Sequence, residues 1–168
     1  MERPDTAVLD VDGTLVDSTY HHALAWRRAF HTFDVEVASW RVHRAIGLGG
    51  DRLVAAVAGQ DVEDHLGDEL RARWDTEYTA IEAEVRPFAG ARELLAALRE
   101  RGWKLALGSS GNPEHSGRAV ELLGGPDAVD GWTTSEDAGS SKPAPDILSA
   151  ALVSVGGRTG ICVGDSPY

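Results

Sequence analysis

The feature that most constrains this chain is an apolar run near the N-terminus that ends in two carboxylates, AVLDVDGTLVDS over residues 7–18. Thr6 to Val11 is rich in β-branched and aliphatic residues, which predicts a buried strand, and Gly13 allows a sharp turn after it. We therefore expect Asp10 and Asp12 at the carboxyl end of this strand. Ligands of open α/β sheets bind at that edge, so two acids there suit metal binding and catalysis.

The same DxDG segment has simpler interpretations. Aspartate and glycine also occur together in turns, where they serve only the backbone geometry. A calcium loop of the EF-hand kind does not fit, because it requires Gly at its sixth position and Glu at its twelfth, and counting from Asp10 these are Leu15 and His21. On these residues alone, both interpretations of the segment, a simple turn and a reactive site, stay possible.

The composition limits the class of protein. A chain of 168 residues can bury a core, and its length fits one domain or one domain with an insert. With 16 Lys and Arg against 27 Asp and Glu, the net charge is -11, which disfavours nucleic acid or an anionic membrane as a partner. The charged start has no apolar signal region, and no membrane span is visible, so we expect a cytoplasmic protein.

The pattern of apolar residues changes twice along the chain. Helical spacing without strand alternation covers residues 18–33, 40–45, 51–58 and 62–84. After Pro87, helices and strands alternate, with helices at 91–101, 113–123 and 145–155 and strands at 103–107, 132–134 and 160–163. We predict an α/β fold with a doubly wound, parallel, Rossmann-like sheet built from residues 1–16 and 86–168, and an inserted α-helical domain at 17–85.

Polar residues also follow the later strands. The segment LALG leads into Ser109, Ser110 and Gly111, which place a hydroxyl and backbone amides at a helix start, an arrangement suited to an anion. An ordinary helix cap by Asn112 or Ser110 fits as well. Lys142 lies in SKPAPD, where two prolines stiffen the loop and would direct the ammonium inward, although a solvated loop lysine is the common case.

The last apolar run, GICV, contains the only cysteine, Cys162, and is followed by Gly164 and Asp165. A cysteine inside such a run is expected to be a small buried hydrophobic residue and not a nucleophile. Asp165 adds a further carboxylate at a strand end, although on its own it could be a helix cap.

Taken in order, DVDGTLVDS, LALGSSG, SKPAPD and CVGDS resemble the four motifs of the haloacid dehalogenase-like hydrolase superfamily, over nearly the whole chain. The insert resembles the helical cap of this superfamily. Within residues 17–26, the spacing between His22 and Trp26 is similar to the His and Trp spacing of one branch of the superfamily. This branch contains the phosphoglycolate phosphatases and β-phosphoglucomutases.

The resemblance implies a role for each core motif. Asp10 would attack phosphorus and form an aspartyl-phosphate, and Asp12 would act as general acid and base. The side chains of Asp10 and Asp165, with the backbone carbonyl of Asp12, would ligate Mg²⁺. Ser109 would hold phosphoryl oxygens, and Lys142 would neutralise the charge of nucleophile and phosphate.

Substrate contacts would come from the loop after the second strand and from the cap. Ser110 and Gly111 would offer amides to the phosphoryl group, and His22, Arg44 and Arg52 are the cap candidates. The arginines could equally be surface ion-pair partners, and His22 could pack against Trp26.

These expectations describe a Mg²⁺-dependent phosphatase of small phosphomonoesters, of the phosphoglycolate or sugar-phosphate type. A sugar-phosphate mutase is the near alternative, although Ile46 and Gly50 stand where the β-phosphoglucomutase pattern has basic residues. A receiver domain would place its acceptor aspartate after a central strand and have no helical insert here. An inactive, truncated module that binds phosphate or a partner is the remaining alternative, and the oligomeric state stays open.

The superfamily pattern continues beyond the GDS of the last motif with a second acid, a helix and a further strand, whereas this chain stops at Tyr168. We therefore expect C-terminal core elements to be missing from this form. The last strand would then expose an apolar face, with weak metal binding or aggregation as the consequence.

Overall fold

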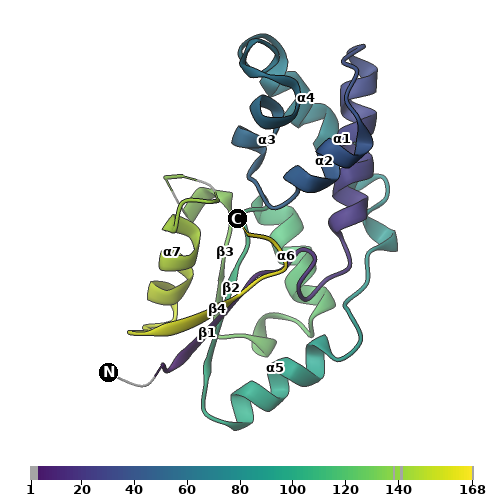
Figure 1. The fold of residues 1–168 in the computed structure, drawn as a ribbon. Coiled ribbons are helices and arrows are strands. Elements are labelled where there is room, and N and C mark those ends of the chain that lie inside the picture. The colour runs from purple at the N-terminus through teal and green to yellow at the C-terminus, as the bar shows by residue number, and fades with distance from the viewer. Residues whose placement is uncertain (1–3, 138, 141, 168) are drawn as a thin grey trace. The chain divides into compact units, whose positions relative to one another are not determined.

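The computed structural model describes residues 4–137, 139–140 and 142–167 (Figure 1). The chain forms two compact units, one made of Met1–Asp17 with Arg86–Tyr168 and the other of Ser18–Val85. The first unit contains all the strands of the described chain, and the second is helical.

The sheet of the α/β unit is parallel and has the strand order β3-β2-β1-β4. Its strands are β1 (Thr6–Leu9), β2 (Lys104–Gly108), β3 (Gly131–Thr133) and β4 (Gly160–Val163). Leu9 lies opposite Leu107 on one side and Val163 on the other, so the carboxyl ends of three strands meet at one edge.

The first strand is two residues shorter than predicted. Asp10 N–H still donates to Val163 O at 2.9 Å, but the backbone then turns. The carbonyl of Val11 accepts the amides of Leu15 and Val16, at 2.9 and 3.0 Å, and closes a tight loop in which Gly13 has a φ of 77°. The turn chemistry of the DxDG segment therefore ends the strand before its apolar pattern does.

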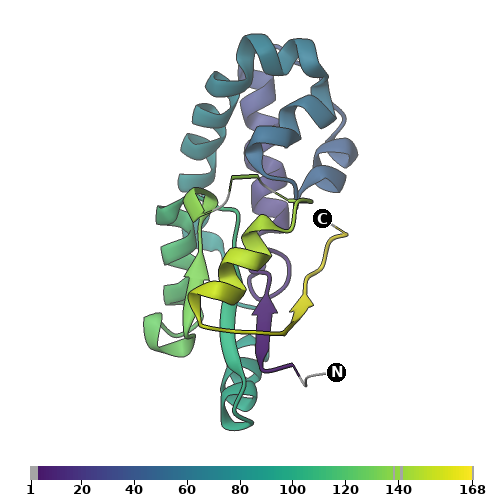
Figure 2. The ribbon, with the colours of Figure 1, turned by 90° about the vertical axis from the view of Figure 1, so that its left-hand side faces the viewer.

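Helices cover both faces of this sheet, as the predicted doubly wound fold requires (Figures 1 and 2). The longer helices of the unit are α5 (Ala91–Glu100), α6 (Pro113–Leu122) and α7 (Asp146–Ser154), and the short 3-10 turns are η2 (Pro126–Ala128) and η3 (Ser135–Asp137). Ile147 and Ala151 of α7 are buried on one face, and Leu95 of α5 is buried on the other. The prediction of an α/β doubly wound sheet is confirmed.

The segments that lead into and out of the helical unit are paired within the α/β unit. Asp17 N–H donates to Arg86 O at 2.8 Å, and Phe88 N–H donates to Leu15 O at 2.9 Å. The chain therefore leaves the α/β unit and returns to it at one place.

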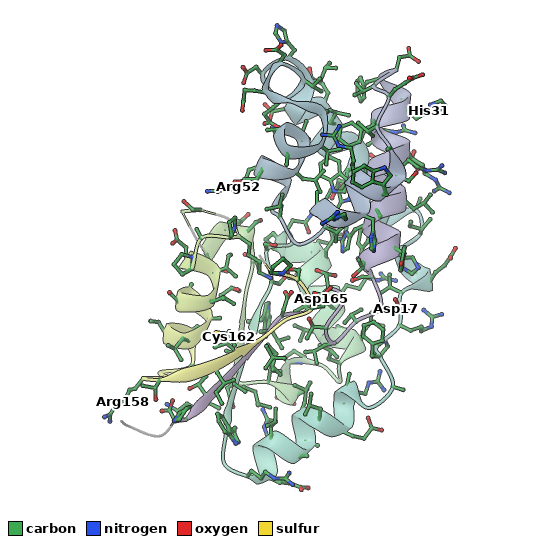
Figure 3. The ribbon with its side chains drawn as sticks, viewed as in Figure 1. Asp17, His31, Arg52, Arg158, Cys162 and Asp165 are labelled. Atoms are coloured by element: carbon green, nitrogen blue, oxygen red, sulfur yellow. The ribbon has the colours of Figure 1, made fainter. Side chains whose placement is uncertain are left out.

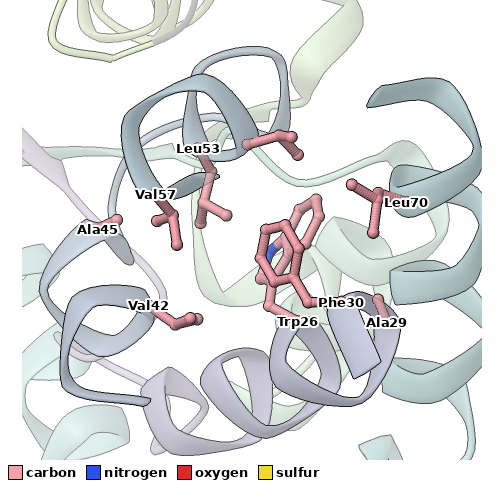
Figure 4. Packing of buried hydrophobic residues seen from close by; sticks show 9 residues of the cluster. Trp26, Ala29, Phe30, Val42, Ala45, Leu53, Val57 and Leu70 are labelled. Atoms are coloured by element: carbon pink, nitrogen blue, oxygen red, sulfur yellow. The ribbon is translucent and has the colours of Figure 1, made fainter. Parts of the chain in front are cut away.

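The helical unit packs its own apolar core, which Figure 4 shows. Its elements are α1 (Thr19–Thr32), α2 (Ser39–Ala45), α3 (Gly50–Ala58), α4 (Gln60–Thr79) and the 3-10 turn η1 (Glu82–Glu84). The predicted single helix over 62–84 is wrong at its end. Beyond Thr79 the hydrogen bonds tighten to i→i−3, as in Ile81 N–H to Tyr78 O at 3.0 Å, and the α-helix gives way to η1.

Truncating the centre of this core should destabilise the helical unit. The side chain of Phe30 is fully buried against Trp26, with ring centroids 5.8 Å apart. We expect Phe30→Ala to cost about 3–5 kcal/mol, because it removes the buried ring and leaves a cavity. Urea denaturation followed by far-ultraviolet circular dichroism measures this loss. His31→Ala, at the exposed neighbouring position, should change stability by less than about 0.5 kcal/mol; equal effects of the two variants would contradict the packing shown.

The expectation that Cys162 is buried is wrong. Cys162 is exposed, and its neighbours Ile161 and Val163 are 47% and 49% exposed (Figure 3). An apolar run predicts burial when a strand is covered on both faces, whereas β4 lies at the end of the strand order and, among the described residues, pairs with β1 alone.

In the part of the chain that the structure describes, no helix combines the length and the apolar character that crossing a bilayer would require.

Candidate functional site

The centre of the candidate site is a buried ion pair at the carboxyl end of β1. Lys142 Nζ donates to Asp10 Oδ1 at 2.6 Å, and Val11 N–H donates to the same oxygen at 2.9 Å. Asp10 is 9% exposed and Lys142 is 4% exposed. Lys142 is thus not a solvated loop lysine. Ser141, which precedes it in the SKPAPD motif, lies outside the described residues.

The environment of Asp10 opposes its ionisation. Burial raises the pKa of the Asp10 carboxyl above its ordinary value, and the carboxylate of Asp12 adds to the rise, while the Lys142 ammonium acts in the other direction. A carboxylate must be ionised to act as a nucleophile. Lys142, together with the backbone amide of Val11, therefore favours the ionised form of Asp10.

The loops after β1 and β4 meet at the same edge of the sheet. A Cβ placed on Gly164 would lie 3.3 Å from Asp10 Cβ and 3.5 Å from Asp10 Oδ2, so a glycine permits this close approach. Asp165 N–H donates to Thr14 Oγ1 at 3.0 Å, and Thr14 O–H donates back to Asp165 Oδ1 at 3.4 Å. These bonds fix the exposed Asp165 beside the loop that carries Asp12 (Figure 3).

The residues predicted to hold Mg²⁺ fit a hard cation by the chemistry of their donors. Among the described residues, Asp10 Oδ2 receives no hydrogen bond, because both donors of this carboxylate go to Oδ1. Across residues 4–137, 139–140 and 142–167, no three His, Cys, Asp or Glu side chains gather as a metal cluster. The predicted set needs only two carboxylates, from Asp10 and Asp165, because Asp12 would contribute its backbone carbonyl. Oxygen donors in this number, completed by water and phosphate, suit Mg²⁺.

The loop after β2 holds Ser109 firmly. Ser109 is 3% exposed, and its Oγ accepts from Gly111 N–H at 3.1 Å. Asn112 Oδ1 accepts from His115 N–H at 2.8 Å and caps α6, so the helix-cap alternative holds for this residue. The amide of Gly111 is thus used within the loop and is not one of the free amides expected there. Ser110 is half-buried.

The sequence reasoning missed Ser116, whose Oγ lies 3.1 Å from Ser109 Oγ. Ser116 is 3% exposed and lies on α6, one helical turn before the buried Val120. A small polar residue at the helical spacing of a buried apolar one is the signal that could have indicated it.

The candidate substrate residues of the insert belong to the helical unit. The ring of His22 stacks on Tyr78 and Trp74, with centroids 4.1 and 5.6 Å away, and Trp74 also stacks on Trp26. His22 is therefore part of an aromatic stack. Its expected neighbour Trp26 belongs to the same stack, but Trp74 lies between the two rings.

The two arginine candidates lie near the surface of the same unit. Arg52, on α3, is exposed and its Nε lies 3.9 Å from Asp51 Oδ2 (Figure 3). Arg44, at the end of α2, is also exposed. The ion-pair interpretation thus holds for Arg52, and a substrate role for either arginine stays a prediction.

A buried Asp–Lys pair lies at the carboxyl edge of the parallel sheet, with a buried serine after the next strand, at the edge where ligands of open α/β sheets bind. The family "haloacid dehalogenase-like hydrolase" matches residues 4–168. The chain therefore belongs to the haloacid dehalogenase-like hydrolase family, as its four motifs indicate.

Individual relatives share this architecture. A curated relative, validoxylamine A 7'-phosphate phosphatase of Streptomyces hygroscopicus subsp. limoneus, is 25% identical over 157 residues, which are 86% of this chain and 68% of the relative. The structure of a hydrolase from Pseudomonas syringae superposes with a TM-score of 0.89 at 26% identity, covering 98% of this chain and 76% of the other. For β-phosphoglucomutase from Clostridium difficile, the TM-score is 0.82 at 17% identity, with 97% and 77% covered, and this likeness concerns the fold alone.

Proposed function

We propose that this enzyme hydrolyses small phosphomonoesters through an aspartyl-phosphate on Asp10. The observation that carries the proposal is the buried 2.6 Å pair of Lys142 Nζ and Asp10 Oδ1 at the ligand-binding edge of the sheet. Burying a charged pair is costly, and a site that needs an ionised nucleophile beside an anionic substrate gives a reason for it. The name of the Streptomyces relative, a phosphatase of a 7'-phosphate, supports the same class of substrate.

In the proposed first step, Asp10 Oδ2 attacks phosphorus and the bond from phosphorus to the ester oxygen breaks. Oδ2 is assigned this role because Oδ1 already accepts two hydrogen bonds. Asp12 donates a proton to the departing alkoxide, so the alcohol leaves neutral. The products of this step are the alcohol and Asp10 acyl phosphate.

In the second step, water replaces Asp10 on phosphorus. Asp12, now a carboxylate, removes a proton from the water as it attacks, and Asp10 leaves as a carboxylate with inorganic phosphate as the product. The ammonium of Lys142 compensates the negative charge of Asp10 in both steps. One acid that gives and then regains a proton is sufficient for the whole cycle.

We assign Mg²⁺ to Asp10, Asp165 and the backbone carbonyl of Asp12. The ion, when bound, supplies positive charge that screens the phosphate from the carboxylates. Ser109 is proposed to donate its hydroxyl to a phosphoryl oxygen. The helical unit is proposed to act as a cap, with His22, Arg44 and Arg52 as the candidates for substrate contacts. In the loop after β2, Ser110 stays a candidate, whereas the amide of Gly111 is already used by Ser109 Oγ.

The first test is phosphate release from p-nitrophenyl phosphate, with Mg²⁺ and with Mg²⁺ removed by a chelator. Metal-dependent release supports the proposal, and a panel of phosphoglycolate and sugar phosphates then defines the substrate. If sugar phosphates return as isomers without release of phosphate, the chain is a mutase. If a folded chain releases nothing and isomerises nothing, the alternative of an inactive binding module is favoured.

Removing the Ser109 hydroxyl should lower turnover without unfolding the protein. We expect Ser109→Ala to reduce kcat/KM about 10²-fold, because one preorganised donor to the developing phosphoryl charge is lost. Steady-state kinetics measures the effect, and Ser149→Ala, at an exposed position of α7, is the matched control. A loss of less than about threefold in Ser109→Ala would remove Ser109 from the proposed machinery.

A further inference from the structure

Ser109 is part of a closed set of hydrogen bonds that includes a second buried hydroxyl. Ser116 O–H donates to Gly111 O at 3.2 Å, and Gly111 N–H donates to Ser109 Oγ at 3.1 Å. The Oγ atoms of Ser109 and Ser116 are 3.1 Å apart and both side chains are buried, which completes a ring of three bonds. This ring lies at the carboxyl end of β2, beside the strand that leads to Asp10.

The hydroxyl protons of this ring have two possible arrangements. A serine hydroxyl has one proton to donate, and a carbonyl oxygen can only accept. Either serine can donate in the bond between the two hydroxyls, and when Ser116 donates to Gly111 O, that bond uses the proton of Ser109. In this arrangement Ser109 has no proton left for a phosphoryl oxygen.

We propose that Ser116 is a positioning residue that enables Ser109 to donate to the phosphoryl group, an inference that rests on the proposed function. When a phosphoryl oxygen arrives, Ser109 turns its proton to it, and Ser116 turns its own proton from Gly111 O to Ser109 Oγ. Only hydroxyl rotation is required, and no bond other than hydrogen bonds forms or breaks. Ser109 Oγ then accepts from Gly111 N–H and from Ser116, which strengthens it as a donor.

Two further contacts support this exchange. Gly111 O also accepts from Ser135 N–H at 2.8 Å, so the carbonyl keeps a partner after Ser116 turns away. A Cβ on Gly111 would lie 3.2 Å from both hydroxyl oxygens, closer than ordinary van der Waals contact, so a glycine leaves the ring undisturbed. The exchange thus leaves no buried polar atom of the ring without a partner, which would otherwise oppose it.

The experiment is a double-mutant cycle on the binding of inorganic phosphate, measured by isothermal titration calorimetry in the presence of Mg²⁺. The four proteins are the unmodified chain, Ser116→Ala, Ser109→Ala and the double variant. We expect Ser116→Ala to weaken phosphate binding about 3- to 10-fold, the value of one neutral hydrogen bond. In the Ser109→Ala background, the same substitution should change binding by less than about twofold, because the hydroxyl through which Ser116 acts is absent.

Two control variants separate this role from a purely structural one. Ser116→Cys keeps a weak donor and should retain more of the phosphate affinity than Ser116→Ala. Ser154→Ala removes a hydroxyl that donates to Ala151 O within α7, at 2.9 Å, and should leave phosphate binding unchanged. Thermal unfolding of each variant verifies that the comparison is made between folded proteins.

The outcomes also separate this inference from the proposed function. Additive effects of Ser116→Ala and Ser109→Ala, no effect of Ser116→Ala, or no phosphate binding by the unmodified chain would each overturn the role of Ser116. Coupled effects on phosphate binding in a chain without phosphatase activity would refute the proposed function and leave the role of Ser116 standing.

Discussion

Asp10→Asn is expected to lower phosphate release about 10⁴-fold or more, the largest effect of any single substitution in this chain. An asparagine has nearly the same shape as an aspartate, but its amide is neutral and a poor nucleophile, so the acyl phosphate does not form. Mg²⁺-dependent release from p-nitrophenyl phosphate, at equal protein concentration, measures the loss. The variant should keep its fold, because the side-chain volume at this buried position is unchanged.

Asp127→Asn is the matched control for this substitution. Asp127 is exposed and lies in η2, in a part of the chain to which the proposed mechanism assigns no role. The Asp127→Asn variant should retain the turnover of the unmodified enzyme. This result would show that the loss of one negative charge does not by itself lower the turnover of Asp10→Asn. Turnover by Asp10→Asn within about tenfold of the unmodified enzyme would exclude nucleophilic catalysis by Asp10.

The fold could be predicted from the sequence because local pattern and global topology agree. The apolar runs that become β1, β2 and β4 are bounded by glycines and acids, and helices of ordinary length separate them, which limits the architecture to a parallel sheet. The exposure of Cys162 could not be predicted from the apolar run around it. The run GICV specifies a strand, but its position at the end of the order β3-β2-β1-β4 depends on pairing and not on composition.

The candidate site was predictable as a set of strand ends but not as a set of contacts. Parallel strands bring Asp10, Ser109 and Asp165 to one edge by topology alone. The pairing of Lys142 with Asp10 spans 132 residues, and only the folded loop determines it. Ser116 was missed because a serine within a helix resembles a surface residue until the face of α6 that packs against Ser109 is known.

Lys142→Met should have the second largest effect and should act on stability as well as on turnover. The substitution removes the ammonium 2.6 Å from Asp10 Oδ1 and leaves a buried carboxylate without its counter-charge. Breaking one partner of a buried pair typically costs about 3–5 kcal/mol, so we expect a loss of this size in the free energy of unfolding at pH 7. Chemical denaturation measures it, and phosphate release should fall as well because the charge of nucleophile and phosphate is no longer compensated.

The pH dependence of this loss identifies its cause. Burial and Asp12 already raise the pKa of Asp10, and without the ammonium the rise is larger. The folded variant then binds a proton more readily than the unfolded chain, so its stability increases as the pH falls from about 7 toward 4 and decreases as the pH rises through the folded pKa. Asp10→Asn/Lys142→Met has no carboxyl at this position and is the reference for all other titrating groups.

At pH 7, Asp10→Asn/Lys142→Met should be at least about 1 kcal/mol more stable than Lys142→Met, because a neutral amide replaces the unpaired charge. The difference between these two variants should shrink toward low pH, where the Asp10 carboxyl of Lys142→Met becomes neutral as well. A difference that stays constant between about pH 4 and pH 7 would mean that lost packing of the lysine stem, and not an uncompensated charge, destabilises Lys142→Met. The buried pair would then be a structural feature of the sheet edge, and the case for Asp10 as an activated nucleophile would lose its main support.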